Sequence, residues 1–151
     1  MTESLPKFVG TNPNSDAREF AMQFLYQSEL EKIFYFSESH FVAFCENFNL
    51  PGKIGKLAEV KCRGVLDSLE KVDAIIVEHS KNWKLSRLAA TDRSVLRLAT
   101  WELLEKSAPP KVILNEAIDL AKKYGTEQSG AFVNGILDAI SRTVTAATQP
   151  E

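Results

Sequence analysis

The chain has 151 residues, of which 44% are hydrophobic and 25% are charged, and its formal net charge at pH 7 is −2. This length and composition are ordinary for a globular protein with one sizeable core, and the negative charge argues against a protein that binds nucleic acid on its own. The sequence contains no apolar run long enough to cross a membrane and no secretory leader. We therefore expect a cytoplasmic protein without a membrane segment.

The charge is unevenly distributed along the chain. Residues 1–50 carry a net charge of −4, residues 51–111 carry +4, and residues 112–151 carry −2. The basic excess of the middle segment is most concentrated in five side chains: Lys81, Lys84, Arg87, Arg93 and Arg97. Such a stripe is either a solvated helix face or a surface that contacts phosphates, and both interpretations stay open.

The first half of the chain predicts three helices after a flexible leader. Residues 1–14 contain prolines, a glycine and asparagines without periodicity, which is typical of such a leader. Ser15 or Asp16 is expected to cap the first helix, and residues 41–48 form a short second one. Residues 53–79 form the longest predicted helix, because their apolar side chains recur at spacings of four and three residues.

The second half predicts three more helices. Residues 92–106 are apolar around most of a helix circumference, so this helix belongs near the centre. Two further helices meet at Gly125, where we expect the positive φ of a helix stop, and Thr126 is expected to cap the second of them. Six residues are predicted to lie in the core: Leu69, Val95, Leu98, Ala99, Ile118 and Ile136.

Hydrophobic residues recur with a helical period throughout the chain, and no segment alternates as a strand would. We therefore predict the all-α class, with a single helical domain over residues 15–146 and a frayed tail over residues 147–151.

Residues that support catalysis or metal binding do not cluster in the sequence. The glycines within residues 125–135 lack the spacing of a phosphate-binding loop. His40 and His79 have no partner one helical turn away, and Cys45 and Cys62 are expected to be buried, reduced thiols. We predict no metal, no cofactor, no small-molecule substrate and no enzymatic activity.

The corner between the last two helices is the strongest candidate for a functional site. Tyr124 and Phe132 flank it, and Gln128 lies within it as a hydrogen-bond donor and acceptor. Aromatic side chains at such a corner either stack on an unpaired base or pack in the core. Periodicity alone favours the core.

Four blocks in this order resemble the NusB family of bacterial transcription antitermination factors. Residues 17–26, which begin Ala-Arg-Glu and end Leu-Tyr, resemble the opening helix of the family. Residues 83–103 resemble its central segment, and residues 109–117 lead to residues 124–135, which contain the string Phe-Val-Asn-Gly. The resemblance covers roughly residues 17 to 138.

The resemblance implies a compact helical domain of two three-helix bundles and an RNA-binding adaptor. A family member pairs with the ribosomal protein NusE, recognises boxA RNA during ribosomal RNA transcription, and acts on the RNA polymerase elongation complex indirectly. Transferred to this sequence, the RNA-binding residues are Arg18, Tyr124, Gln128 and Phe132. The residues implied for the protein partner are Tyr26 and an exposed Asp92.

The sequence departs from the family where positive charge is expected. Many members carry arginines just before the Ala-Arg-Glu start and a lysine just before Phe-Val-Asn-Gly. Here the corresponding residues are Asn14, Ser15 and Asp16, and Ala131. Fewer neutralised phosphates mean weaker and less salt-dependent RNA binding. The alternative is therefore a protein–protein interaction module, or a regulator whose RNA binding has been weakened or lost. The related accessory domain of ribosomal RNA methyltransferases is disfavoured, because the chain has no glycine-rich methyl-donor motif.

Overall fold

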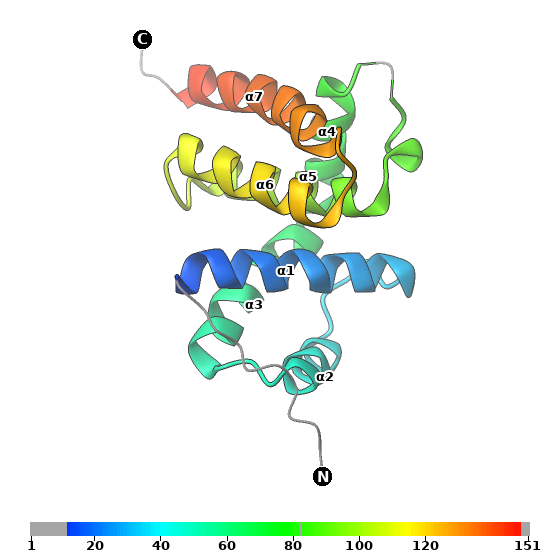
Figure 1. Cartoon of the computed structure of the whole chain (residues 1–151), viewed down its shortest axis with the longest axis vertical. Coiled ribbons are helices and arrows are strands. Elements are labelled where there is room, and N and C mark those ends of the chain that lie inside the picture. The colour runs from blue at the N-terminus through cyan, green and yellow to red at the C-terminus, as the bar shows by residue number, and fades with distance from the viewer. Residues whose placement is uncertain (1–11, 82, 149–151) are drawn as a thin grey trace. The chain divides into compact units, whose positions relative to one another are not determined.

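The computed structural model describes residues 12–81 and 83–148, and these residues form helices without any strand. The chain divides into two compact units, residues 1–67 and residues 68–151 (Figure 1). The first unit contains α1 (Pro13–Leu30), α2 (Glu38–Phe48) and α3 (Gly52–Asp67). The second contains α4 (Leu69–His79), the 3₁₀ turn η1 (Leu85–Arg87), α5 (Ala90–Glu105), α6 (Pro110–Tyr124) and α7 (Ser129–Thr148). The predicted all-α class is confirmed.

The first helix begins earlier than predicted. The side chain of Asn12 accepts hydrogen bonds from the backbone N–H groups of Asn14 (2.9 Å) and Ser15 (3.3 Å), and Pro13 occupies the first helical position. Proline is favoured there because its missing N–H would have no partner in the helix. Asn12 is thus the cap in place of Ser15 or Asp16. The rest of the predicted leader, residues 1–11, lies outside the described residues, as do residues 149–151 of the predicted tail; α7 continues to Thr148.

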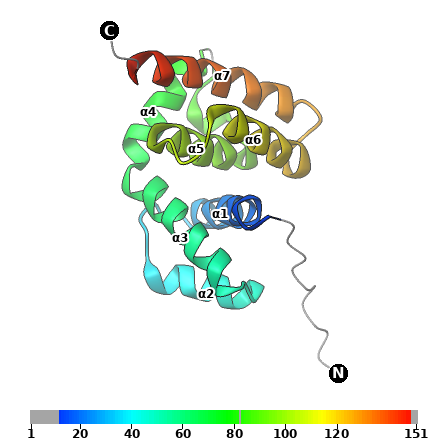
Figure 2. The same ribbon diagram turned by 90° about the vertical axis from the view of Figure 1, so that its left-hand side faces the viewer.

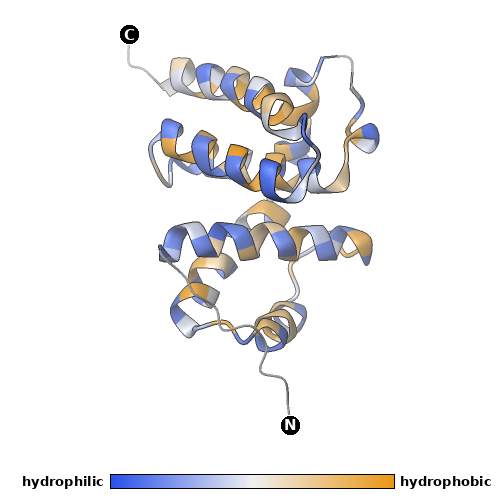
Figure 3. Cartoon of the chain, in the orientation of Figure 1, coloured by the Kyte–Doolittle hydropathy of each residue, from blue (hydrophilic) through white to orange (hydrophobic). Residues whose placement is uncertain are grey.

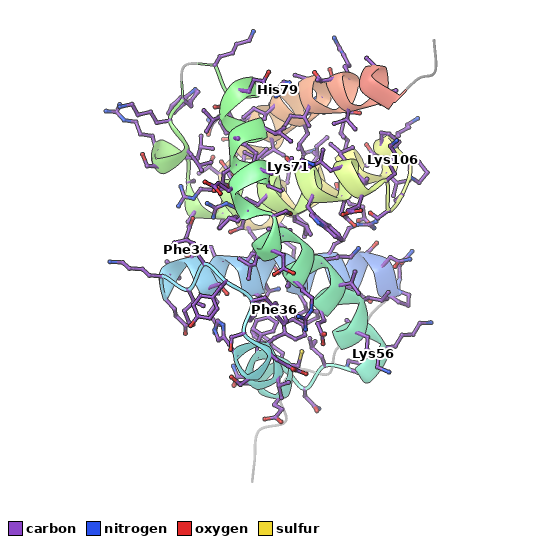
Figure 4. The ribbon with its side chains drawn as sticks, turned by 180° about the vertical axis from the view of Figure 1, so that it is seen from behind. Phe34, Phe36, Lys56, Lys71, His79 and Lys106 are labelled. Atoms are coloured by element: carbon purple, nitrogen blue, oxygen red, sulfur yellow. The ribbon has the colours of Figure 1, made fainter. Side chains whose placement is uncertain are left out.

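The core of the first unit is a cluster of aromatic rings. Phe24 of α1 is fully buried, and its ring centroid lies 5.0 Å from that of Phe41 and 5.3 Å from that of Phe44, both of α2. Phe36 lies in the loop before α2 (Figure 4). The guanidinium of Arg63 lies 4.3 Å from the centroid of its ring. Edge-to-face and tilted ring pairs of this kind add about 0.5–1.5 kcal/mol each to the stabilisation from burial.

The long helix predicted over residues 53–79 is divided. Ser68 adopts φ −117° and ψ 24°, outside the helical region, and separates α3 from α4. The apolar spacing continues across this break, because Val65 and Val72 are both fully buried. Hydrophobic periodicity indicates which residues face a core, and it does not reveal a single non-helical residue between two helical segments. The break explains why the second unit contains four helices.

The second unit is built around α5, which packs against α4, α6 and α7 (Figure 2). All residues of α5 from 94 to 103 are buried, as its apolar circumference predicted. Hydrophilic and hydrophobic residues alternate along the ribbons of α6 and α7, as expected of helices with one buried face (Figure 3). None of the described helices is long and apolar enough to cross a membrane.

Four of the six predicted core residues are buried: Val95, Leu98, Ala99 and Ile136. The predictions for Leu69 and Ile118 were wrong, because both are half-buried. Leu69 is the first residue of α4, directly after the break at Ser68. Ile118 lies beside the buried stripe of α6, which consists of Ile113, Ala117, Leu120 and Ala121.

Candidate nucleic-acid interface

The corner between α6 and α7 is closed by a glycine, for a reason other than the predicted one. Gly125 has φ −100° and ψ −154°, which is extended backbone that any residue can adopt. Its N–H donates a 2.8 Å hydrogen bond to the carbonyl oxygen of Ala121. A Cβ atom at this position would lie 2.7 Å from the same carbonyl oxygen and would overlap the side chain of Ser129. Glycine is required because the chain passes too close for a side chain, and not because φ is positive.

The start of α7 is held by Ser129, which the sequence analysis did not single out. The hydroxyl oxygen of Ser129 accepts a 2.9 Å hydrogen bond from the N–H of Thr126, and lies 3.3 Å from the hydroxyl of Thr126. This is the reciprocal half of a capping box, in which a side chain three residues further along reaches back to the backbone N–H of the capping residue. Thr126 therefore takes part in the cap, but α7 begins three residues later, at Ser129. The spacing Thr-x-x-Ser is the signal that could have identified this arrangement.

The structure brings Tyr124, Gln128 and Phe132 to this one corner. Gln128 is exposed, whereas Tyr124 and Phe132 are half-buried, so neither ring is enclosed in the core. The ammonium of Lys123 lies 5.5 Å from the centroid of the Tyr124 ring. Phe132 makes an edge-to-face contact with Trp83, with centroids 6.0 Å apart and ring planes at 76°. The corner thus combines two partly accessible rings with an amide that can donate and accept hydrogen bonds.

The basic stripe of the sequence separates into exposed and structural side chains. Lys81, Lys84 and Arg87 are exposed. Arg93 donates hydrogen bonds to the carbonyl oxygens of Leu85 (2.9 Å) and Leu88 (2.7 Å), and so holds the loop before α5. Arg97 forms an ion pair within the second unit. Its side chain is 9% exposed and forms two hydrogen bonds with Asp73 of α4, at 2.8 Å and 2.9 Å. Three of the five cations therefore remain available to a phosphate.

The other implied site residues are less accessible than the resemblance suggests. Arg18 of α1 is 5% exposed, and Tyr26 of the same helix is half-buried. Asp92 is 7% exposed, and its Oδ1 atom is buried without a hydrogen-bond partner. The expectation of an exposed Asp92 was wrong, because this residue lies in the first turn of the central helix α5. A carboxylate there interacts favourably with the positive end of the helix dipole.

The histidines and cysteines have structural surroundings. His79 places its Nδ1 atom 2.9 Å from the carbonyl oxygen of Ile75 and its Nε2 atom 3.1 Å from the hydroxyl of Thr143. Cys45 and Cys62 are unbridged, and Cys62 is fully buried. Burial raises the pKa of both thiols, most strongly that of Cys62. Across residues 12–81 and 83–148, no three residues of metal-binding type come together.

Trp83 is the residue that the sequence analysis missed at this site. The sequence indicates Trp83 only as the first residue of a block that resembles the NusB family, because a lone tryptophan between two helices shows no periodicity. The structure leaves it 52% exposed and in contact with Phe132.

Comparisons with known proteins agree with this architecture. The sequence profile of the NusB family matches residues 15–142. A transcription antitermination protein NusB from Anaeromyxobacter dehalogenans is 43% identical over 144 residues, which cover 93% of this chain and 99% of that protein. The structure is also similar to Thermotoga maritima NusB, with a TM-score of 0.76 at 38% identity, covering 88% of this chain and 93% of the other. A structure of the antitermination factors NusB and NusE in complex with double-stranded RNA matches with a TM-score of 0.78 at 28% identity, over 89% of this chain and 99% of the matched chain. The chain belongs to the NusB family.

Proposed function

We propose that this protein is an RNA-binding adaptor for transcription antitermination, which pairs with the ribosomal protein NusE and recognises boxA RNA in the cytoplasm. Family membership over residues 15–142 supports this role, together with the similarity to a chain solved with NusE and RNA. The observation that carries the proposal for this chain is the half-buried aromatic corner formed by Tyr124 and Phe132. The adaptor acts on the RNA polymerase elongation complex through the RNA and NusE, without chemistry of its own.

At this corner, recognition depends on stacking and hydrogen bonding. Phe132 offers a ring on which an unpaired base can stack, which contributes about 1–3 kcal/mol per base. Gln128 is exposed beside it and can pair with the edge of a base. Tyr124 closes the other side of the corner.

The residues proposed for the partner contact are Tyr26 of the first unit and Asp92 of the second. Tyr26 is half-buried on α1, so its phenol retains accessible surface for a protein contact. The burial of Asp92 favours its competing role at the start of α5 over a direct contact. We therefore assign the contact with NusE chiefly to Tyr26.

The residues proposed to bind RNA present little positive charge. Arg18 is buried, and Ala131 is exposed where many family members carry a lysine. These observations favour the second candidate function, a protein–protein interaction module in which RNA binding is weakened. The two functions differ in one measurable respect, which is whether the corner contributes to RNA affinity when NusE is present.

The test measures the binding of a single-stranded boxA RNA oligonucleotide in the presence of saturating NusE. We expect Phe132→Ala to weaken binding by about 1–3 kcal/mol through the loss of one stack. Ala131→Lys should tighten binding and steepen its salt dependence, since it adds a cation next to the corner. Tyr26→Ala should lower the affinity for NusE, measured without RNA.

The matched control is Phe48→Ala in the first unit. Phe48 is also a partly exposed ring in edge contact with another aromatic, because its centroid lies 5.7 Å from that of Phe20. It should change stability without changing RNA affinity. If Phe132→Ala behaves like Phe48→Ala, and Ala131→Lys has no effect at low salt, the interaction-module function is correct instead.

A further inference from the structure

The loop between α4 and α5 carries a concentration of positive charge that the proposed function does not yet use. From residue 79 to residue 91 the sequence contains Lys81, Lys84 and Arg87 and no acidic residue. The side chains of all three cations are exposed, and none of these side chains forms an ion pair or hydrogen bond with the part of the chain that the structure describes. Trp83 lies between them, also exposed. Figure 1 shows this segment in green, leading away from the end of α4.

Hydrogen bonds from side chains to backbone carbonyl oxygens, on both sides of Trp83, hold this loop. The hydroxyl of Ser80 lies 3.2 Å from the carbonyl oxygen of Val77 and 2.9 Å from that of Trp83. On the far side, Arg93 donates to the carbonyl oxygens of Leu85 and Leu88, and Leu88 itself is buried. The loop therefore presents its side chains from a supported backbone, which lowers the entropy lost when a ligand binds.

The ring of Trp83 is placed next to the proposed base-stacking ring. Its plane makes an angle of 76° with that of Phe132, at a centroid distance of 6.0 Å. Because the two planes are nearly perpendicular, one base cannot stack on both rings. The pair is suited to two neighbouring bases that point in different directions, as in a single strand whose bases are splayed apart.

Lys81 has an unfavourable backbone conformation for its residue type. It follows the last turn of α4 with φ 52°, in the left-handed region that glycine occupies without penalty. A left-handed conformation is unfavourable for a residue that carries a side chain. Glycine would relieve this cost, so Lys81→Gly removes the cation without adding backbone strain.

From these observations we infer that residues 80, 81 and 83–89, which the structure describes between α4 and α5, form a second RNA-contacting element. Trp83 stacks on a base next to the one on Phe132, while Lys81, Lys84 and Arg87 contact the phosphates that connect them. This inference rests on the proposed function, because it extends the RNA path from the same corner. It also supplies positive charge that Asn14, Ser15, Asp16 and Ala131 lack.

The first experiment measures tryptophan fluorescence during titration with single-stranded boxA RNA at saturating NusE. The chain contains two tryptophans, and Trp101 is buried while Trp83 is exposed. Stacking of a base on Trp83 should quench its emission, whereas Trp101 serves as an internal reference. We expect the wild-type protein to show quenching that Trp83→Phe removes. Trp83→Phe should keep RNA affinity within about threefold, because phenylalanine can still stack, and Trp83→Ala should weaken it by about fivefold or more.

The second experiment tests the cations with a matched pair of substitutions. Lys81→Gly and Lys106→Gly both replace a left-handed lysine by glycine at the end of a helix, with φ 52° and 57°. Only Lys81→Gly should weaken RNA binding, and it should reduce the slope of log affinity against log salt by about 0.7, the value for one phosphate contact of a single strand. Lys84→Ala and Arg87→Ala should each lower the slope by a similar amount.

The outcomes separate this inference from the function on which it rests. If Phe132→Ala weakens RNA binding but quenching is absent and the loop variants bind like the wild type, the loop inference is wrong and the proposed function stands. If the loop variants weaken binding of NusE and leave RNA affinity unchanged, the loop is a protein contact and the inference is again wrong. If wild-type protein with NusE does not bind boxA RNA, both the loop inference and the proposed function are wrong.

Discussion

The two units of this protein reach a stable core by different means. In the first unit, aromatic rings from α1, α2 and the loop between them gather around Phe24. In the second, the core is mainly aliphatic and surrounds α5, with the ion pair of Arg97 and Asp73 between α4 and α5. An aromatic cluster concentrates stabilisation in a few large side chains, whereas an aliphatic helix bundle distributes it over many. The accessible ring pair of the proposed RNA site, Trp83 and Phe132, belongs to the second unit, outside the aromatic core.

The largest effect is expected from truncating the central ring of the first unit. Phe24→Ala should reduce the free energy of unfolding by about 3–5 kcal/mol, because it removes a fully buried ring and leaves a cavity among its neighbours. Leu96→Ala in the second unit should cost less, since that side chain is equally buried but smaller. Urea denaturation followed by circular dichroism measures both. An equal or larger loss for Leu96→Ala would contradict the proposed difference between the cores.

The second prediction compares one arginine from each unit. Arg97→Ala should cost about 3 kcal/mol, at the lower end for breaking a buried ion pair, because Asp73 keeps 21% of its side-chain surface in water. Arg63→Ala should cost under about 1 kcal/mol, since its ion pair with Glu59 is exposed and its contact with Phe36 is at the surface. Urea denaturation measures the two losses. A double-mutant cycle of Arg97→Ala with Asp73→Ala separates the interaction energy of the ion pair from other effects of Arg97. Equal losses of stability for Arg97→Ala and Arg63→Ala would contradict the stronger contribution of the buried pair.

The sequence predicted the elements of both units better than it predicted their ends. Helical periodicity arises from burial, so the central position of α5 and the two helices around Gly125 could be read from it. The break at Ser68 and the burial of Asp92 could not, because each depends on the packing of neighbouring elements. The same limit applies to the site. The string around Tyr124 and Phe132 was recognisable, but the contact of Trp83 with Phe132 joins residues about fifty positions apart.

The third prediction concerns lysines that end helices in the left-handed conformation. Lys32 in the first unit and Lys106 in the second have φ 59° and 57°. Replacing either by glycine should raise stability by up to about 1 kcal/mol, since the strain removed exceeds the entropy that glycine adds to the unfolded chain. Lys56→Gly is the control, because Lys56 is exposed in the interior of α3 and the same substitution there should cost about 1 kcal/mol. Thermal melting shows whether each of the three substitutions raises or lowers stability. A loss of stability in Lys106→Gly would show that the lysine side chain stabilises the fold by more than its left-handed backbone destabilises it.

The smallest effect concerns the thiols, both of which lie in the first unit. Burial raises the pKa of Cys62 well above its usual value, and it raises that of Cys45 less, with the charge of Glu59 contributing. A thiol whose pKa is higher in the folded state holds its proton longer there than in the unfolded chain. It therefore contributes stability below the unfolded thiol pKa of about 8.5, and that contribution declines as the pH rises above this value. Cys62→Ala should flatten the fall of unfolding free energy between about pH 8.5 and 10, and Cys45→Ala should flatten it less.

Alkylation by iodoacetamide at pH 8 gives an independent readout, because half-buried Cys45 should react in the native protein while Cys62 should react only after unfolding. Equal alkylation rates for the two thiols would mean that the first unit opens readily around α3, and its aromatic core would then be less stable than its ring contacts indicate.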